Sequence, residues 1–366
     1  MNGNVHLVPV NLDIFESGMR INFSMYTKGA GGFRLLCKNA TLNDDLIKRL
    51  RELSSESDVY IPKEYMSQVI SASSYFTKNQ KELEEYIGYP EIKKETANML
   101  DIVAMTNIVP ADVAENITKT LNDKLNRFEA SNIIQCLNGM RNVDEYLCSH
   151  SANVAMINGL MGKWIGLSED DEFLLVQTGL VHDIGKLSVP PEILNKPGKL
   201  TADEFNEMKK HSVYSYNMLI ASGVKNETLL MGVKQHHEKT NGFGYPDGLR
   251  TDQISLFARI TSIADVYDAM ISKRVYKDAH SPFEILHQFS IGRFSDLDID
   301  YVNVFLLHMP LELTGKMAVL SNGMIAKVVY VNPTDYSHPI IELDGKVLVT
   351  NNDLYCVSMY FDKLEK

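Results

Sequence analysis

The chain has 366 residues, enough for two or three domains, and its 45% hydrophobic and 23% charged residues are typical of a soluble globular protein. The formal net charge of −11 argues against non-specific nucleic-acid binding, which needs a basic face. The four cysteines form no C-x-x-C pair, so we expect reduced thiols. The N-terminal segment has no signal-peptide pattern, so we expect a cytoplasmic location. No apolar run approaches the roughly 20 residues that cross a bilayer, so we expect no membrane segment.

Residues 1–70 are predicted to form a small α+β domain. The segments 20–27 and 31–38 have the composition of β-strands and are separated by a glycine-containing turn, which indicates a hairpin. A helix is expected over 41–53, where leucines recur at helical spacing after Thr41 as the N-cap. A closing strand is expected near residue 60, and we find no catalytic constellation in this domain.

The rest of the chain divides into three further segments by its residue pattern. Residues 71–130 are predicted to be a helical connector, broken at Pro90 and Pro110. Residues 131–310 follow a helical pattern almost throughout. In 311–366, β-branched runs are split by Asn-Gly and Asp-Gly, dipeptides that favour two-residue hairpin turns. We therefore expect a mainly α protein, with a helical domain at 131–310 and a β-rich C-terminal subdomain.

A series of histidines and aspartates lies in or beside helix-patterned segments of 131–310: His150, His182, Asp183, His211, His236, His237 and Asp265. Adjacent residues of a helix point about 100° apart, so each adjacent pair can approach one metal centre from two sides, or its carboxylate can bridge two ions. Lys186 lies three to four residues beyond the first pair and can face the same site.

Seven candidate ligands exceed the needs of one ion and fit a two-metal centre. Imidazole and carboxylate without thiolate suit Fe, Mn or Zn. Two such ions would activate a bridging hydroxide and stabilise the charge that develops in phosphoester hydrolysis.

Each of these residues taken alone has a more common structural explanation. A single histidine is more often a surface or hydrogen-bonded core residue than a ligand, and Asp265 could be an acid on a polar helix face. If Asp265 is buried among Ile263, Ala264 and Val266, however, it needs a partner, because burying an unpaired charge is costly. The ordered set as a whole favours the metal centre.

The motifs that contain these residues resemble those of the HD-GYP family: "HSANVA" at 150–155, "HDIGK" at 182–186, His211, "HHEKTNGFGYPDGL" at 236–249 and "ADVYDAMISKRVY" at 264–276. This family is the bacterial branch of HD-domain metal phosphohydrolases that hydrolyses cyclic di-GMP. The resemblance covers about 131–310 and is specific, because plain HD-domain proteins share the HD pair without the HHE-GYP block. Residues 5–67 and 320–332 resemble, more loosely, regions that flank this catalytic domain.

The resemblance implies an all-helical bundle with the metals at its centre, and it implies roles for particular residues. All seven residues of the series match the family's metal ligands, with Asp183 as the bridge. Lys186 matches the lysine that meets the substrate phosphate, and Arg274 matches a basic residue that contacts the nucleotide. Asp183 and Lys186 are therefore the expected catalytic residues.

The loop after His237 matches the family's signature loop beside the substrate cleft. Gly244, Tyr245 and Pro246 are expected at the substrate, because glycine permits close backbone approach and tyrosine offers an aromatic face to a guanine or to a partner protein. A tight turn in which Tyr245 only packs the loop remains an alternative.

Three positions depart from the family pattern. Some members have a glutamate four residues before the first histidine, where it helps to hold a third metal, but here that position is Tyr146. Glu145 lies about 140° off the face of His150 on a helix, which favours two ions over three. Asn241 and Phe243 stand where many members have Asp and Ser, and they remove no ligand.

The resemblance implies hydrolysis of cyclic di-GMP to linear pGpG, with a second cut to GMP if the linear product is held. Iron is the first expectation for the two ions and manganese the second. Another cyclic dinucleotide as substrate, a low-turnover cyclic di-GMP receptor or interaction module, and a structural protein whose histidines only pack stay open as alternatives. A signalling protein bound at the GYP loop and a homodimer are left open as partners, whereas nucleic acid and membrane are not expected.

Overall fold

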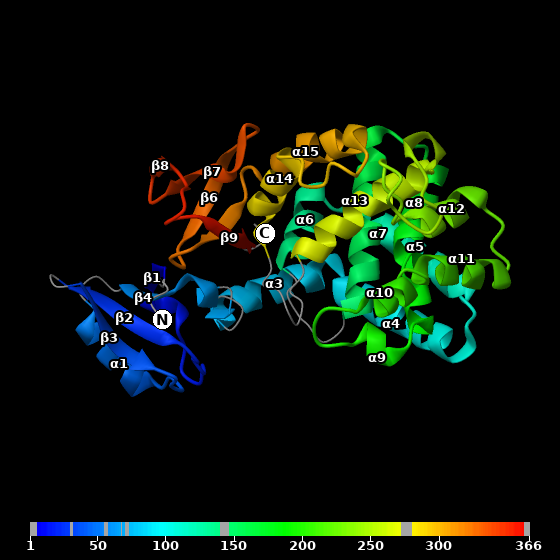
Figure 1. Ribbon diagram of the computed structural model, residues 1–366. Helices are drawn as coiled ribbons and strands as arrows, with labels where there is room; N and C mark the ends of the chain where they lie inside the picture. The colour runs from blue at the N-terminus through cyan, green and yellow to red at the C-terminus, as the bar shows by residue number, and fades with distance from the viewer. Residues whose placement is uncertain are drawn as a thin grey trace.

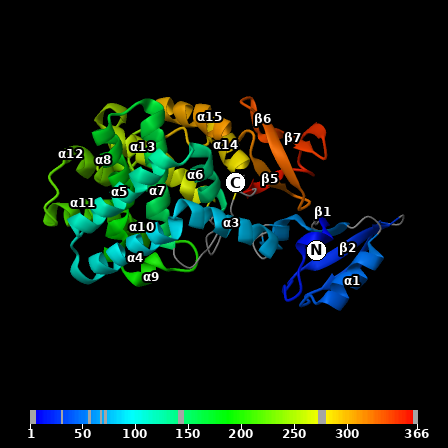
Figure 2. The same ribbon diagram turned by 180° about the vertical axis from the view of Figure 1, so that it is seen from behind.

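The computed structural model describes residues 6–29, 32–54, 58–66, 68–69, 73–139, 146–271 and 280–361. Over these residues the protein is mainly α, with a four-stranded sheet near the N-terminus and a five-stranded sheet near the C-terminus. The two sheets lie on the same side of the helical domain, as Figures 1 and 2 show from opposite directions. The predicted fold class is confirmed.

The N-terminal sheet is antiparallel with the strand order β1-β4-β2-β3. The predicted hairpin is confirmed as the β2–β3 pair. The prediction that Thr41 caps the following helix was wrong. The side chain of Asn43, two residues later, accepts the N–H of Leu46 at 2.8 Å and is the N-cap. The elements are β1 Leu7–Asn11, η1 Leu12–Ile14, β2 Ser24–Gly29, β3 Gly32–Lys38, α1 Asp44–Leu53, β4 Asp58–Pro62 and η2 Lys63–Tyr65.

The connector consists of three helices, α3 Ser74–Ile87, α4 Tyr89–Thr106 and α5 Ala111–Arg127. The predicted breaks at both prolines are confirmed. Pro90 lies in the first turn of α4, where backbone N–H groups make no intrahelical hydrogen bond, so the missing N–H of proline costs nothing there. Pro110 is the residue before α5.

The helical domain is arranged around α7, a helix that carries apolar residues on all sides and is therefore buried on all sides. It packs against α8, α13 and the connector helix α4. The elements that follow the connector are α6 Ala130–Gly139, α7 Tyr146–Ile165, α8 Glu169–Val181, η3 Ile184–Ser188, α9 Pro191–Leu194, α10 Ala202–Met208, α11 His211–Ala221, α12 Glu227–Gln235, η4 Thr251–Gln253, α13 Leu256–Ile271, α14 Pro282–Ser290 and α15 Ile299–Leu313. None of the helices described is both long and apolar enough to span a bilayer.

The C-terminal sheet is antiparallel with the order β8-β7-β6-β5-β9. Both hairpins predicted from Asn-Gly and Asp-Gly are confirmed, as β5–β6 and β7–β8. The fifth strand, β9, was not predicted and pairs with β5. The strands are β5 Met317–Leu320, β6 Ile325–Asn332, β7 Asp335–Leu343, β8 Lys346–Val349 and β9 Cys356–Tyr360.

The N-terminal sheet shares its hydrophobic core with part of the C-terminal sheet. Val319 of β5 and Val357 and Tyr360 of β9 belong to the same cluster of buried side chains as the N-terminal strands. The N–H of Asn11 donates to the carbonyl oxygen of Asn322 at 2.7 Å. Regions far apart in the sequence are thus packed together, and the division into 1–70, 71–130, 131–310 and 311–366 stays a prediction.

Candidate metal centre

The HD pair lies at a change of direction in the backbone. Its two residues were predicted to be helical, and this was wrong: α8 ends at Val181 with His182 as its C-cap, and Asp183 precedes the short 3-10 helix η3. Asp183 has φ −105° and ψ 5°, outside the α-helical region. The turn, rather than the 100° step of a helix, brings the imidazole and the carboxylate to one centre.

Gly185 allows η3 to lie directly against α11. A Cβ atom at this position would be only 2.1 Å from the carbonyl oxygen of His211. The Ser215 hydroxyl fastens the contact, since it accepts the N–H of Gly185 at 2.8 Å and donates to the carbonyl oxygen of His182 at 2.8 Å. The glycine of the HDIGK motif therefore brings the HD pair close to His211.

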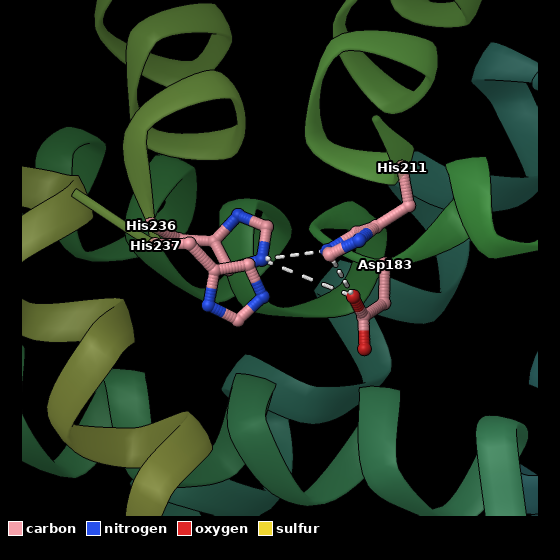
Figure 3. A group of neighbouring side chains, drawn as sticks. All are labelled: Asp183, His211, His236 and His237. Atoms are coloured by element: carbon pink, nitrogen blue, oxygen red, sulfur yellow. Dashed lines mark hydrogen bonds and ion pairs between the residues drawn. The ribbon is translucent and has the colours of Figure 1, made fainter. Parts of the chain in front are cut away.

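The structure brings all seven residues of the predicted series together in two neighbouring groups. Potential ligand atoms within each group lie within 4.8 Å of one another. In Figure 3, His236 and His237 reach the centre from one side, and His211 and Asp183 from the other. The first group is Asp183, His211, His236 and His237, and the second is His150, His182 and Asp265.

Asp183 lies between the two groups with one oxygen toward each. Its Oδ2 is 3.2 Å from His150 Nε2 and 3.3 Å from His182 Nε2. Its Oδ1 is 3.2 Å from His211 Nε2 and 3.8 Å from His236 Nε2. This is the arrangement that a carboxylate bridging two ions requires.

Asp265 also connects the groups, on the more open side of the centre. Its Oδ1 is 3.2 Å from His150 Nε2 and its Oδ2 is 3.9 Å from His237 Nδ1. Burial alone would raise the pKa of Asp265, but the hydrogen bond and charge of His150, with His237, hold it well below its ordinary value. The mid-helix aspartate is thus ionised and has partners.

Three of the histidines have a fixed tautomer. The Nδ1 atoms of His182, His211 and His236 each lie 2.7 Å from the carbonyl oxygen three residues earlier in the chain. A carbonyl oxygen can only accept, so each Nδ1 carries a hydrogen, and in a neutral ring the Nε2 presents a lone pair. All three lone pairs belong to the atoms that face the Asp183 carboxylate.

These lone pairs fit a cation. The Nε2 atoms of His211 and His236 are 3.4 Å apart, and when both rings are neutral with hydrogen on Nδ1, neither Nε2 can donate to the other. The buried Nε2 of His182 has no hydrogen-bond partner among the described residues. A divalent ion would satisfy lone pairs that otherwise repel one another, and the donor set of imidazole and carboxylate suits Fe, Mn or Zn.

The protonation states are also those that metal binding needs. Burial, together with the neighbouring His182 and His211, lowers the pKa of His236 to about 3, and burial lowers the pKa of His237 as well. Burial alone would raise the pKa of Asp183, but the Lys186 ammonium and adjacent imidazoles hold it well below its ordinary value. At neutral pH the two histidines are neutral and the carboxylate is ionised.

Lys186 contacts Asp183 directly. Its Nζ donates to Asp183 Oδ2, and its side chain is mostly buried. Two other residues singled out in the sequence, Arg274 and Glu145, lie outside the described residues. Tyr146 is the first residue of α7.

Glu238, the glutamate of the HHE motif, holds the signature loop. Its buried carboxylate accepts three backbone N–H groups, from Asp247 at 2.6 Å, Gly248 at 3.0 Å and Leu249 at 2.9 Å. Sequence reasoning assigned it no role, although its place beside the paired histidines was a usable signal. It ties the far end of the loop to the histidine pair.

The near end of the loop packs onto the same pair. The ring of Tyr245 is tilted against that of His237 with 4.7 Å between the ring centroids, and its N–H donates to the His237 carbonyl oxygen at 3.2 Å. Gly244 allows this approach, since a Cβ there would be 2.3 Å from the backbone nitrogen of Lys239. Phe243 points into solvent with 89% of its surface exposed. The packing of Tyr245 fits the tight-turn alternative, and a contact of Gly244, Tyr245 or Pro246 with substrate stays a prediction.

Two further buried residues near the centre, Asp268 and Asn153, were not predicted from the sequence. Asp268 Oδ2 accepts from His150 Nδ1 at 2.7 Å, and its Oδ1 accepts from Asn153 Nδ2 at 2.7 Å. Asp268 lies three residues after Asp265, a spacing that places both on one side of α13 and could have indicated a shared task.

Comparisons with known proteins agree with this geometry. Residues 136–290 match the family model described as HD domain. The cyclic di-GMP phosphodiesterase response regulator RpfG of Xanthomonas campestris is 44% identical over 126 residues, which cover 34% of this chain and 33% of that protein. The 3′3′-cGAMP-specific phosphodiesterase 3 of Vibrio cholerae is 39% identical over 134 residues, covering 37% of this chain and 29% of that protein.

Among solved structures, the chain resembles Bd1817, an HDG"Y"P protein from Bdellovibrio bacteriovorus, with a TM-score of 0.51 and 17% sequence identity. That match covers 83% of this chain and 99% of the other, and at this identity it shows the fold alone. The chain spans about a third of the length of the two curated relatives. Its residues 136–290 nevertheless belong to the HD domain family, and their motifs place them in its HD-GYP branch.

Proposed function

We propose that this chain is a metal-dependent phosphodiesterase that hydrolyses cyclic di-GMP to linear pGpG, with GMP as the product of a second cut. The observation that carries the proposal is the position of Asp183, which presents one oxygen to each of two groups of buried imidazoles. Two divalent ions, Fe first and Mn second, would be held by all seven residues of the series. The similarity to RpfG supports cyclic di-GMP as the substrate.

The chain's own residues prepare the site for an anionic substrate. When bound, two divalent ions supply an activated water and neutralise phosphoryl charge. The neutral His236 and His237 and the ionised Asp183 are ready to bind cations without losing a proton first. Lys186 adds a positive charge beside Asp183, where the charge of a phosphodiester develops during hydrolysis. This local charge opposes the overall net charge of −11, which repels an anionic substrate.

A mixed cyclic GMP-AMP is the second candidate substrate. It is favoured by the similarity to the 3′3′-cGAMP-specific phosphodiesterase 3 of Vibrio cholerae. The preference among cyclic dinucleotides depends on the shape of the cleft, and a contact between Arg274 and the nucleotide stays a prediction. A signalling partner at the GYP loop and a homodimer stay predictions as well.

The test is turnover of cyclic di-GMP and of 3′3′-cGAMP by protein purified without oxygen, with bound metals counted in the same sample. We expect about two Fe or Mn ions per chain, and pGpG or GMP from the first substrate. The double substitution His182→Ala with Asp183→Ala should lower turnover by orders of magnitude, because it removes the bridge and a ligand.

Two results would contradict the proposal. A full metal complement with hydrolysis of neither dinucleotide would point to a receptor. A protein that binds no metal would mean that the histidines only pack. Faster hydrolysis of 3′3′-cGAMP than of cyclic di-GMP would instead favour the second candidate.

A further inference from the structure

A chain of buried hydrogen bonds leads from the candidate ligand His150 to the connector helix α4. His150 Nδ1 is 2.7 Å from Asp268 Oδ2, and Asn153 Nδ2 is 2.7 Å from Asp268 Oδ1. The hydroxyl of Tyr89 is 2.7 Å from Asn153 Oδ1. All four side chains are at most 2% exposed, so water does not compete for these bonds.

The direction of every hydrogen bond follows from the carboxylate. The carboxylate of Asp268 accepts both hydrogen bonds, so His150 donates its Nδ1–H and Asn153 presents its amide NH₂. The carbonyl oxygen of the Asn153 side chain therefore faces Tyr89 and accepts the hydroxyl proton. The carbonyl oxygen of Ser149 is also near the Tyr89 hydroxyl, but at 3.5 Å it is the weaker acceptor.

This chain acts on the metal centre through the ring of His150. With its Nδ1–H bonded to Asp268, His150 turns Nε2 toward Asp183 and Asp265, each 3.2 Å away, and this nitrogen offers its lone pair to an ion once it carries no proton. A carboxylate behind a metal-binding histidine fixes the tautomer and ring orientation and raises the basicity of the ligand. Asp268 can hold His150 in this way only if the orientation of its own carboxylate is fixed. Asn153 fixes it by donating a hydrogen bond to the second oxygen of that carboxylate.

We propose that Tyr89 and Asn153 are positioning residues of the metal centre, which hold Asp268 so that His150 presents Nε2 to one of the two ions. By this proposal the connector helps to position a metal ligand, because Tyr89 is the first residue of α4 and lies outside the residues 136–290 that match the HD domain. It rests on the metal centre of the proposed function and not on any particular substrate.

The test compares Co²⁺ binding to metal-free protein with and without the Tyr89 hydroxyl. Tyr89→Phe removes one oxygen and leaves the ring in place. We expect binding of one of the two Co²⁺ ions to weaken roughly 3- to 10-fold, less than the 10- to 100-fold typical of a group bonded directly to a ligand. The visible absorption of that ion should change, because the ligand field of His150 changes with its orientation.

Tyr336→Phe is the matched control. Tyr336 is a buried tyrosine of β7 whose hydroxyl donates to the carbonyl oxygen of Leu306 at 3.3 Å, away from the metal centre. It should leave both Co²⁺ affinities and the spectrum unchanged. In the background of Asn153→Leu, which already interrupts the chain, Tyr89→Phe should have no further effect on Co²⁺ binding.

Three outcomes overturn the proposal. One is equal Co²⁺ affinity and an equal spectrum for Tyr89→Phe and Tyr336→Phe. Another is a lower thermal stability of the metal-free Tyr89→Phe variant with unchanged Co²⁺ binding, which would show a merely structural role. The last is a wild-type chain that binds no Co²⁺. If Co²⁺ binding behaves as expected but no cyclic dinucleotide is hydrolysed, the proposed function fails and the positioning role stands.

Discussion

His236 links the electrostatics of the centre to the stability of the fold. Its pKa is about 3 in the folded metal-free chain and about 6.5 when exposed, so between these values the unfolded chain binds one more proton. The contribution of His236 to the free energy of unfolding should therefore be fully present above pH 6.5, and the free energy of unfolding should fall as the pH drops from 6.5 toward 3. The expected slope from this residue is roughly 1.4 kcal/mol per pH unit.

Urea unfolding of the metal-free protein at a series of pH values measures this slope. His236→Gln removes the titrating ring, so its unfolding free energy should fall less steeply than that of the wild type below pH 6.5. The metal-free form is required, because a bound ion would add its own dependence on pH. Parallel curves for wild type and variant would contradict the assignment of the low pKa to His236.

The sequence predicted the members of the centre but not the residues that support them. The seven residues could be predicted because histidine and aspartate are the types that bind metals, and their order along the chain is informative. Asp268, Asn153 and Tyr89 could not be predicted, because their hydrogen bonds depend on how α13, α7 and α4 pack. The HD pair also shows the limit of local pattern, since the helical run gives no sign that α8 ends at Val181.

At the scale of elements, the loop from Glu238 to Leu249 owes its shape to one carboxylate. Glu238→Gln replaces one acceptor oxygen by a donor NH₂, which then faces a backbone N–H of Asp247, Gly248 or Leu249. A hydrogen bond to a charged group is worth about 1.5–3 kcal/mol, so the loop should open more often. We expect kcat/KM for a cyclic dinucleotide to fall about tenfold with the metal content unchanged.

Hydrogen exchange of the amides at 247–249 tests this prediction directly. They should exchange faster in Glu238→Gln than in the wild type. Glu207→Gln serves as the control, because Glu207 is bonded to Lys210 and Tyr214 and not to this loop. Unchanged protection at 247–249 would show that the loop is held by other contacts.

Elements were predictable from sequence where the signal is local. The C-terminal hairpins follow from Asn-Gly and Asp-Gly, each of which specifies its own turn. Strand β9 carries no such signal. All five of its residues are buried, so it lacks the alternation of a half-exposed strand, and its partner β5 lies more than 35 residues earlier in the sequence.

At the scale of the whole molecule, the N-terminal and C-terminal sheets depend on each other. Val319→Ala removes two methyl groups from the core that they share and should destabilise the N-terminal sheet by about 1–2 kcal/mol. Amides of β1 and β4 should then exchange faster with solvent. Val328→Ala is the control, because Val328 lies in the neighbouring strand of the same sheet but packs into the core of the helical domain. Equal exchange of β1 and β4 in both variants would contradict the shared core.

The shared core also sets an order of events during synthesis. The N-terminal sheet leaves the ribosome first, yet three side chains of its core belong to β5 and β9. Roughly 250 residues separate Pro62 from Met317, which take about 13–50 s to translate at 5–20 residues per second. For that time the apolar face of the nascent sheet stays uncovered, so this part of the chain is the one on which a ribosome-associated chaperone should act.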